Sequence, residues 1–585
     1  MGTRNHVGSI LVADCGTVMT RAMLLDRVQG KHRLLSWSEV PSTWSRPWNA
    51  VGDGVRGAVE RISTITARRL LDENSDLITS DVTSQRGVDI FGCTVSASEP
   101  LTVTIGGMAG DVSLASARRA AAGTYSQVVA VLNDTSGLPL SKEACLQKVR
   151  DAPSDVILIA GGVEGGAERP ITRVLEAVAL ACSTMDPEMR PTIVYAGNSR
   201  LRRGPAAIFG ADTDLRMVRN IRPTLESEYL ADAQSELQAL FIERKMNQLP
   251  GFSPVTKWSP APTVPTAHAF GKLVHYLWRR GAGKSGVLGV DVGGANTTIV
   301  AVFDDRLYLT VRADLGIALG GGPLLDRLGS RSVTRWHPEP VSADEARALL
   351  MNKSSFPASI PHVKRELWLE QALVREVIRT TLDVARQGWQ PGIAQIYPDL
   401  LPLCDTIIVS GGGLAHAARS RETVLMVLDA VQPIGVSTLM VDTCGLTPAL
   451  GSLTDQSPLT AAEAIDAGGL ATLGTVIAPV GEAREGRPLM SVTVACDNGR
   501  KQDLEIRAGD LEFLPLPARQ KALVQIRPRR TIDVGLGGPG AGTVLEVNGG
   551  RAGLVIDARG RPLILRSDPG RRRRQIQSWL GEADE

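Results

Sequence analysis

Two stretches of the chain share one pattern of apolar and polar positions. In each, a short apolar run ends in an aspartate, a glycine-containing turn follows, and two further apolar runs come next; the stretches run from Val7 to Val40 and from Gly286 to Leu315. Short apolar runs separated by Gly/Asp turns predict β-hairpins. We therefore predict an internal duplication in which Asp14 and Asp291 are equivalent, with a candidate helix after each stretch.

Between the two stretches, apolar runs alternate with helical patterns. Strands are predicted near residues 101–105, 127–132, 155–160 and 191–195, with helices between them. This alternation predicts a small doubly wound parallel sheet, which we assign to an inserted α/β domain over residues 89–205. A further helical pattern, over 224–247, lies in a predicted helical connector that spans 206–265.

After residue 480 the pattern changes to strand-like runs broken by glycine-rich turns. These runs occur at 489–496, 522–526, 542–547 and 553–557. They predict a separate β-rich C-terminal domain over residues 481–585. The remaining segments, 1–88 and 266–480, are then the two lobes of the duplicated part.

The charge balance limits the partners to be considered. The chain has 585 residues with 64 Lys and Arg against 62 Asp and Glu, so its net charge is only +2. This balance argues against a polycationic nucleic-acid binder. Aromatic residues make up only 4%, which argues against a stacking platform for single strands. The basic runs at 527–530 and 571–574 are typical of solvated faces, so we expect no nucleic-acid partner.

Cysteine spacing and hydropathy exclude further classes. Seven cysteines are spread along the chain and no two form a C-x-x-C pair, so neither a zinc site nor a redox dithiol is predicted. The first apolar run reaches Asp14 within eight residues, which is too short for a signal peptide or a membrane helix. We expect a cytoplasmic protein with no membrane partner.

The two aspartate turns carry the strongest chemical signal. Asp14 and Asp291 each end an apolar run, with a glycine two residues later. Bare glycine backbone beside a carboxylate lets a phosphate approach, and two such turns facing each other would hold the phosphates of a nucleotide. Both aspartates are candidate catalytic residues and would reach Mg²⁺ through water. Either turn alone is more often an ordinary β-turn, but two copies in register favour the phosphate interpretation.

A third glycine-rich segment is a further candidate for ligand binding, beside the two aspartate turns. An apolar run that ends at Ser410 leads into three glycines and then a predicted helix, which leaves room for a flat ligand face such as adenosine. We interpret His416, just beyond the glycines, as structural. The candidate cofactor-binding residues are Gly16, Thr17, Thr20, Arg21, Gly293, Gly294, Asn296, Thr297, Gly411, Gly412 and Gly413.

The three segments follow the order of the phosphate-1, phosphate-2 and adenosine motifs of actin, Hsp70 and sugar kinases, and the chain resembles that ATPase superfamily. More narrowly, it is similar to the MutL-type family, component L of the glutamate mutase system, which is unrelated to DNA mismatch repair. This narrower resemblance spans nearly the whole chain and is carried by Leu11-Val-Ala-Asp-Cys-Gly-Thr17, Ser154-Asp-Val-Ile-Leu-Ile-Ala-Gly-Gly162, Tyr195-Ala-Gly-Asn198, Gly289-Val-Asp-Val-Gly-Gly-Ala295 and Gly553-Leu-Val-Ile-Asp-Ala-Arg-Gly560.

The resemblance implies both a fold and a function. The implied fold is α/β, with duplicated actin/Hsp70-like (ribonuclease H-like) lobes, an inserted flavodoxin-like domain and a β-rich C-terminal domain. The implied function is an ATP-dependent accessory or reactivating chaperone of an adenosylcobalamin-dependent mutase, with ATP and Mg²⁺ as cofactors and a mutase subunit as partner. The insert has no Asp-x-His-x-x-Gly pattern to supply a cobalt ligand, so we expect no direct cobalamin binding.

The turns depart from the family pattern. Val18 and Met19 remove two possible phosphate donors from the first turn, whereas Asn296 and Thr298 stand where a threonine and a carboxylate are expected in the second. A missing carboxylate weakens the positioning of Mg²⁺ or water, so we expect weak hydrolysis. Two alternatives of the same fold are a small-molecule kinase and a non-hydrolysing, nucleotide-gated scaffold. ATP-driven electron-transfer activators need clustered cysteines, and the cysteines of this chain are dispersed.

Overall fold

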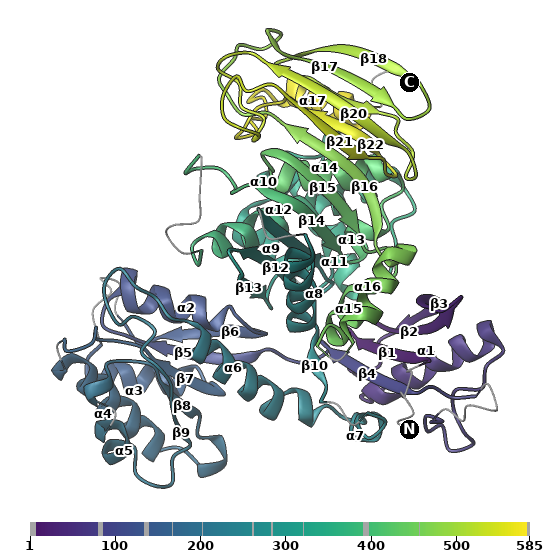
Figure 1. The fold of residues 1–585 in the computed structure, drawn as a ribbon. Helices are drawn as coiled ribbons and strands as arrows, with labels where there is room; N and C mark the ends of the chain where they lie inside the picture. Colours follow the sequence, from purple (N-terminus) through teal and green to yellow (C-terminus); the bar gives the residue numbers. More distant parts are fainter. Residues whose placement is uncertain are drawn as a thin grey trace, which may run out of the picture. The chain divides into compact units, whose positions relative to one another are not determined.

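The protein consists of two compact units. The computed structural model describes residues 8–79, 86–133, 140–166, 168–201, 203–259, 262–281, 285–319, 321–389, 397–455 and 457–581. Unit 1 comprises Met1–Ser96, Pro254–Tyr308 and Leu315–Glu585, and unit 2 comprises Ala97–Ser253 and Leu309–Asp314. Among the described residues, sheets of five, eight and four strands belong to unit 1 and one sheet of five strands belongs to unit 2. Each unit has its own hydrophobic core, and Figure 1 labels the strands and helices that form the units.

The first lobe of unit 1 is built on a five-stranded sheet. In spatial order its strands are β3 (Lys31–Pro41), β2 (Met19–Val28), β1 (Ile10–Cys15), β4 (Ile90–Val95) and β10 (Val264–Pro265). β1 pairs antiparallel with β2 and parallel with β4. Every residue of β1 is buried, because this apolar run lies in the middle of the sheet. Helix α1 (Val51–Thr66) follows the three-stranded meander and contacts β2 and β3.

The second lobe repeats this arrangement. Its first five strands, in spatial order, are β13 (Arg306–Arg312), β12 (Thr297–Phe303), β11 (Gly286–Val292), β14 (Cys404–Ser410) and β15 (Gly435–Val441). β11 pairs antiparallel with β12 and parallel with β14, as β1 does with β2 and β4. The two sheets therefore share one strand order and one set of directions, and the predicted duplication is confirmed.

Helices follow the fifth strand in both lobes and touch each other. α8 (Thr266–Arg280) comes after β10, and α15 (Thr447–Leu453) comes after β15. The two helices approach so closely that a Cβ on Gly451 of α15 would lie 1.7 Å from the carbonyl oxygen of Ala269 in α8. Only glycine allows this backbone contact, which joins the two lobes.

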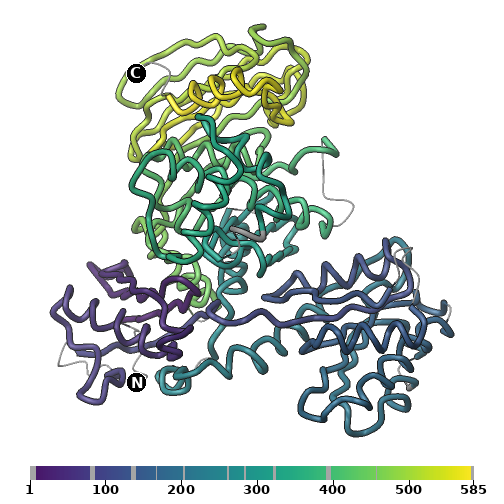
Figure 2. The backbone as a smooth tube through the Cα atoms, turned by 180° about the vertical axis from the view of Figure 1, so that it is seen from behind, coloured from purple at the N-terminus to yellow at the C-terminus, as the bar shows by residue number. Residues whose placement is uncertain are grey.

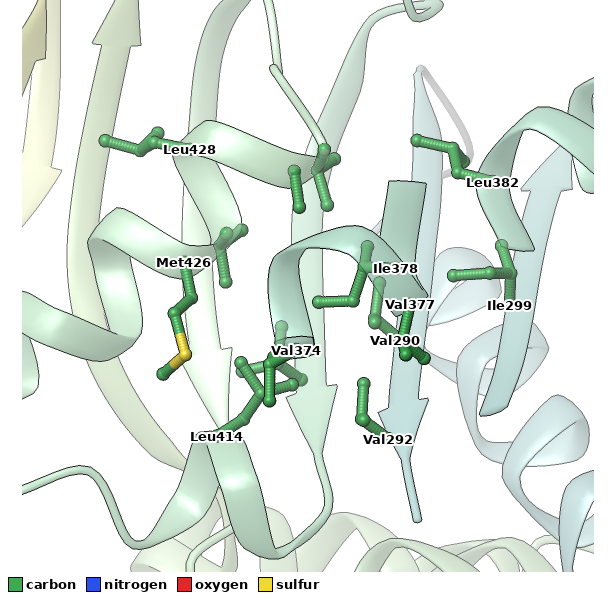
Figure 3. Packing of buried hydrophobic residues seen from close by; sticks show 14 of the residues in the cluster. Val290, Val292, Ile299, Val374, Val377, Ile378, Leu382, Leu414, Met426 and Leu428 are labelled. Carbon is green, nitrogen blue, oxygen red and sulfur yellow. The ribbon is translucent and has the colours of Figure 1, made fainter. Parts of the chain in front are cut away.

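The core of the second lobe lies between its sheet and two long helices. These are α12 (Lys364–Arg386) and α14 (Ser420–Ala430). In Figure 3, Val374 and Val377 of α12 lie beside Val290 and Val292 of β11, and Leu414 lies near Val374. Each fully buried aliphatic side chain of this kind stabilises the fold by about 1.5–3 kcal/mol. The core therefore fixes the strands whose ends carry the candidate turns.

Further helices of this lobe surround the same core. They are α9 (Gly321–Leu328), α10 (Ser330–Thr334), α11 (Ala343–Ser355) and the single-turn α13 (Gly412–Ala415). Helix α16 (Pro458–Ala464) packs instead on α15 and on β3 of the first lobe. The loop between α11 and α12 is mostly exposed to solvent.

The C-terminal segment is β-rich, as predicted, but it is joined to the second lobe by strand pairing. Three strands extend that lobe's sheet to eight, in the order β16 (Ala471–Ala478), β22 (Gly553–Asp557) and β19 (Leu511–Leu514). A separate four-stranded sheet contains β18 (Lys501–Arg507), β17 (Pro488–Cys496), β20 (Lys521–Pro528) and β21 (Thr543–Asn548). The last helix, α17 (Pro569–Leu580), packs on α14.

Unit 2 is a small parallel α/β domain, drawn in blue tones in Figure 2. Its strands, in spatial order, are β6 (Ser126–Val131), β5 (Leu101–Gly106), β7 (Val156–Ile159), β8 (Thr192–Tyr195) and β9 (Leu215–Met217), and all neighbours run parallel. Numbered by chain position this order is 2-1-3-4-5, the flavodoxin-like order. Its helices are α2 (Ala115–Ala121), α3 (Lys142–Asp151), α4 (Arg169–Ser183), α5 (Arg203–Phe209) and α6 (Ala231–Arg244).

The borders of the units differ from those predicted. β4 lies in the segment assigned to the insert (89–205), yet it pairs with β1 of unit 1. Unit 2 continues to Ser253, so most of the predicted connector (206–265) belongs to it, and α6 is shorter than the helix predicted over 224–247. Strand partners distant in sequence decide these borders, and local patterns do not reveal them.

Candidate functional site

The two predicted turns have the same local structure. In the first, the N–H of Gly16 donates to the carbonyl oxygen of Met19 at 3.0 Å; in the second, the N–H of Gly293 donates to that of Asn296 at 2.9 Å. In both hairpins the aspartate pairs with the second residue after the turn: Asp14 pairs with Arg21, and Asp291 pairs with Thr298. The duplication therefore extends to individual hydrogen bonds of the backbone.

The turns also touch each other. A Cβ on Gly294 would lie 2.3 Å from Cγ2 of Val18, so the valine side chain of the first turn rests on the glycine backbone of the second. Arg21 reaches across in a similar way, because a Cβ on Gly445 would lie 2.6 Å from its Cδ. The first lobe thus contacts the second through the residues nearest to the two aspartates.

The third predicted segment borders the same region. β14 is parallel to β11, and Ser410 is the register partner of Asp291. Gly411 follows with φ of +97°, and a Cβ there would lie 2.0 Å from the carbonyl oxygen of Val292. At Gly412 an added Cβ would meet no described atom within 4 Å. Gly411 is thus required by packing, whereas Gly412 leaves an open backbone face.

One cavity joins the three segments, and the free space in and in front of it, open solvent included, is about 1230 Å³. The predicted residues that line the cavity are Asp14, Gly16, Thr17, Arg21, Asp291, Gly293, Gly294, Asn296, Gly411, Gly412 and Gly413. His416, interpreted from sequence as structural, also lies in the lining and is exposed.

Two predicted binding residues, Thr20 and Thr297, are absent from this lining among the described residues. Both are fully buried, and the hydroxyl of Thr297 donates to the carbonyl oxygen of Leu315 at 2.8 Å. Successive residues of a strand point to opposite faces of the sheet. Arg21 and Thr298 share the face of the aspartates with which they pair, so their neighbours Thr20 and Thr297 point away from the cavity.

Burial governs the ionisation of both aspartates. Burial raises the pKa of Asp14, although its carboxylate accepts hydrogen bonds from Thr94 Oγ1 at 2.6 Å and Thr266 Oγ1 at 2.7 Å. Burial raises the pKa of Asp291 to about 6, and the negative charge of Asp14 contributes in the same direction. The guanidinium of Arg21 opposes both shifts. One buried carboxylate and one partly buried carboxylate beside a single arginine form a site that favours an additional cation.

A third carboxylate, Asp442, belongs to this group and was missed from sequence. It follows β15 and accepts hydrogen bonds from the N–H groups of Leu446 at 2.9 Å and Thr447 at 2.7 Å, so it caps α15. Its charge raises the pKa of both Asp14 and Asp291. The signal was available: an apolar strand ending in Asp, with glycine three residues later, resembles the two turns.

The loop between α11 and α12 forms another wall of the cavity that sequence reasoning missed. Its lining residues are Pro357, Ala358, Ser359, Ile360 and Pro361. Beside them, Lys353 Nζ lies 3.0 Å from Glu370 Oε2, and both side chains line the cavity. No motif marks these residues, because they come from the ends of two helices that only the fold brings to the glycine segment.

Two negative findings concern the described part of the chain. Within it, no group of three or more His, Cys, Asp or Glu side chains is arranged to hold a metal ion. A divalent cation at Asp14 and Asp291 would therefore take the rest of its ligands from water or a bound phosphate. No helix among the described residues is long and apolar enough to cross a membrane.

Paired lobes of one strand order, with two aspartate turns and a glycine segment around one cavity, define the ATPase fold of actin, Hsp70 and the sugar kinases. Among families, the model of the MutL protein family matches residues 10–467. The chain belongs to the MutL family, whose members are associated with the components of glutamate mutase.

Comparisons with individual proteins give distant likenesses. No curated protein matches the chain. Among solved structures it is similar to gluconate kinase from Lactobacillus acidophilus, with 8% identity over 80% of this chain and 93% of that one and a TM-score of 0.30. It is also similar to the ethanolamine utilization protein EutJ from Carboxydothermus hydrogenoformans, with 10% identity over 77% of this chain and 90% of that one and a TM-score of 0.27.

Proposed function

We propose that unit 1 binds Mg-ATP in this cavity and that the protein is an ATP-dependent accessory factor of an adenosylcobalamin-dependent mutase. The observation that carries the nucleotide part is the convergence of two identically bonded aspartate–glycine turns with an open glycine backbone on one cavity. Glycine N–H groups and a nearby arginine are suited to phosphate oxygens.

Each part of the nucleotide has candidate partners. Gly16, Thr17 and Arg21 of the first turn and Gly293 and Asn296 of the second would bind the phosphates. The open face of Gly412, with the pair Lys353–Glu370 on the facing wall, would hold the nucleoside. The apolar side chains of this wall suit a flat base, and the ion pair suits ribose hydroxyls.

Asp14 and Asp291 fit a role toward Mg²⁺. Asp14 is buried and Asp291 is partly buried, and the pKa of each carboxyl is raised, first by burial and then by neighbouring negative charges. A divalent cation nearby would therefore offset an existing repulsion. Mg²⁺ bound with a nucleotide would neutralise phosphate charge and orient the terminal phosphate. Asp14 and Asp291 would hold its water ligands, and Thr94 and Thr266 keep the carboxylate of Asp14 in place.

The second turn argues for slow hydrolysis. Thr298, the register partner of Asp291, is buried, and its hydroxyl has no hydrogen-bond partner within the described part of the chain. A carboxylate at this position would help to position Mg²⁺ or water, and a threonine cannot replace its charge. We therefore propose that ATP binding, followed by weak hydrolysis, changes the contact between the lobes.

The proposed partner follows from family membership. A reactivating chaperone must release damaged cofactor from the mutase, and unit 2 has the flavodoxin-like order of cobalamin-binding domains without their cobalt-ligand motif. We propose that unit 2 competes for the face of the mutase on which such a domain docks. A deletion for testing this should span 97–253 rather than 89–205, because residues 90–95 form a strand of unit 1.

The test is ATP binding and turnover by the purified chain with Mg²⁺, with Asp291→Ala as the comparison. Binding and slow turnover that both disappear in the variant support the proposal. Phosphate transfer to a small metabolite would identify the kinase alternative, and nucleotide binding with no turnover would identify the scaffold. Absence of any nucleotide binding by the unmodified chain would contradict the assignment of the cavity.

A further inference from the structure

The loop between α11 and α12 exposes an unusual amount of apolar surface. Its residues 356–363, with the adjoining end of α11, carry four large apolar side chains that are more than half exposed: Met351 (57%), Phe356 (64%), Ile360 (61%) and Val363 (54%). Single exposed apolar side chains are ordinary on protein surfaces, whereas a group of them on one short segment marks an interaction site. We call residues 356–363 the docking loop.

The same loop is also a wall of the nucleotide cavity. Of the four exposed apolar side chains, only Ile360 belongs to the cavity lining; Met351, Phe356 and Val363 are not part of it. Pro357 and Pro361 stand on either side of Ile360 and restrict the backbone there. Residues 357–361 of the loop thus line the cavity, whereas Phe356 and Val363 are exposed to solvent outside it.

A hydrogen bond and an ion pair, both made by Lys353, connect the cavity lining to this loop. Lys353 Nζ donates a hydrogen bond to the carbonyl oxygen of Ser359 and lies 3.0 Å from Glu370 Oε2. Both charged side chains are largely buried and line the cavity. A ligand that draws the ammonium group of Lys353 toward the cavity, or separates it from Glu370, would change its hydrogen bond to Ser359, and occupancy of the cavity would then act on the position of the loop.

We propose that the docking loop binds a protein partner that presents an apolar groove, and that nucleotide in the cavity changes the affinity of this contact. This inference rests on the proposed function, which supplies the mutase as the partner. The four side chains expose on the order of 450 Å², against roughly 800 Å² per partner in a standard stable interface. This area suits a transient partner and is too small for a permanent dimer of this chain.

The experiment compares two variants of the full chain. Phe356→Ser combined with Val363→Ser removes the exposed apolar groups without touching the cavity lining, and serine suits position 363 because it precedes the first residue of α12. Ile564→Ser is the matched control, since Ile564 is 76% exposed in the C-terminal segment. Affinity for purified glutamate mutase is measured with and without a non-hydrolysable ATP analogue, and affinity for the analogue alone is measured separately.

We expect the double variant to bind the mutase at least tenfold more weakly, because aromatic anchors dominate such contacts. Its affinity for the analogue and both affinities of Ile564→Ser should stay within twofold of the unmodified chain. The analogue should change the mutase affinity of the unmodified chain at least threefold. Unchanged mutase binding by the double variant, no mutase binding by the unmodified chain, or a dimer that the double substitution dissociates would each overturn the proposal. Failure of the analogue to bind the unmodified chain would instead contradict the proposed function.

Discussion

Replacing Asp291 by asparagine should stabilise the nucleotide-free protein while it removes Mg-ATP binding. Asp291 is partly buried in the cavity wall, and the loss of solvent contact is the main cause of its raised pKa, to which the charges of Asp14 and Asp442 add. Asparagine has nearly the same shape and a side-chain amide that can keep a hydrogen bond to Ser410, but it carries no charge. The substitution therefore removes an unfavourable buried charge at small steric cost.

The size of the effect follows from the pKa. Burial and neighbouring charges raise the pKa of Asp291 from 3.8 to about 6. One pKa unit corresponds to about 1.4 kcal/mol, so the ionised carboxylate destabilises the folded state by about 3 kcal/mol at neutral pH. This destabilisation is fully present above pH ~6, decreases as the pH falls toward 4 because the folded state becomes protonated, and is absent below that range.

The assay is chemical unfolding of nucleotide-free protein at pH 7.5 and at pH 4.5, followed by calorimetric titration with Mg-ATP at pH 7.5. Asp291→Asn should raise the free energy of unfolding by up to about 3 kcal/mol at pH 7.5 and by much less at pH 4.5. Mg-ATP binding should fall below detection. A variant that is equally destabilised at both pH values would refute the argument from buried charge.

Asp557→Asn provides a control of opposite sign. Burial opposes the ionisation of Asp557, but the positive charges of Arg559 and Arg561 outweigh it and lower the pKa of the carboxyl well below its usual range. Losing this carboxylate should destabilise the protein at pH 7.5 by about 3–5 kcal/mol, because the buried guanidinium of Arg561 loses its carboxylate and that of Arg559 keeps only Asp429. Stabilisation by both substitutions would show that the measurement does not report local charge.

Three further predictions concern packing and the buried ion pairs. Gly451→Val should separate α8 from α15, because its side chain would collide with the carbonyl of Ala269; a loss of cooperative unfolding measured by calorimetry would support this, and an unchanged melting temperature would contradict it. Arg559→Met should lower the free energy of unfolding in urea by about 1.5–3 kcal/mol, since it leaves buried Asp429 and Asp557 with one arginine each instead of two; a neutral effect would refute this. Gly411→Ala should weaken Mg-ATP binding at least tenfold in calorimetric titration, since it strains a left-handed residue against Val292, and wild-type affinity would contradict it.

The part of the site that the sequence predicts well is local in sequence. Asp14 and Asp291 each end a strand and begin a turn, and one short pattern specifies the strand, the turn and the position of the carboxylate together. The glycines after β14 are equally local. The two aspartate turns also predict the duplicated fold, because β1 and β11 hold equivalent places in their sheets.

The part that sequence reasoning misses depends on tertiary structure or on the faces of strands. Lys353 and Glu370 meet in the cavity only because two helices pack there, and nothing in their own segments indicates it. Thr20 and Thr297 are predicted binding residues, whereas the pairing of the hairpins turns their side chains away from the cavity. β22 completes a sheet that begins more than 250 residues earlier, which no local pattern can reveal.

That late strand has a consequence for the synthesis of the chain. β16 ends at Ala478 but pairs in parallel with β22, which begins only at Gly553. A growing polypeptide therefore presents β16 with one unpaired edge until Asp557 has left the ribosome, and an unpaired edge invites pairing with other chains. A chain cut at residue 467, where the family match ends, would lack β16 as well and would leave the edge of β15 open. Soluble production of the second lobe therefore requires translation to continue through β22.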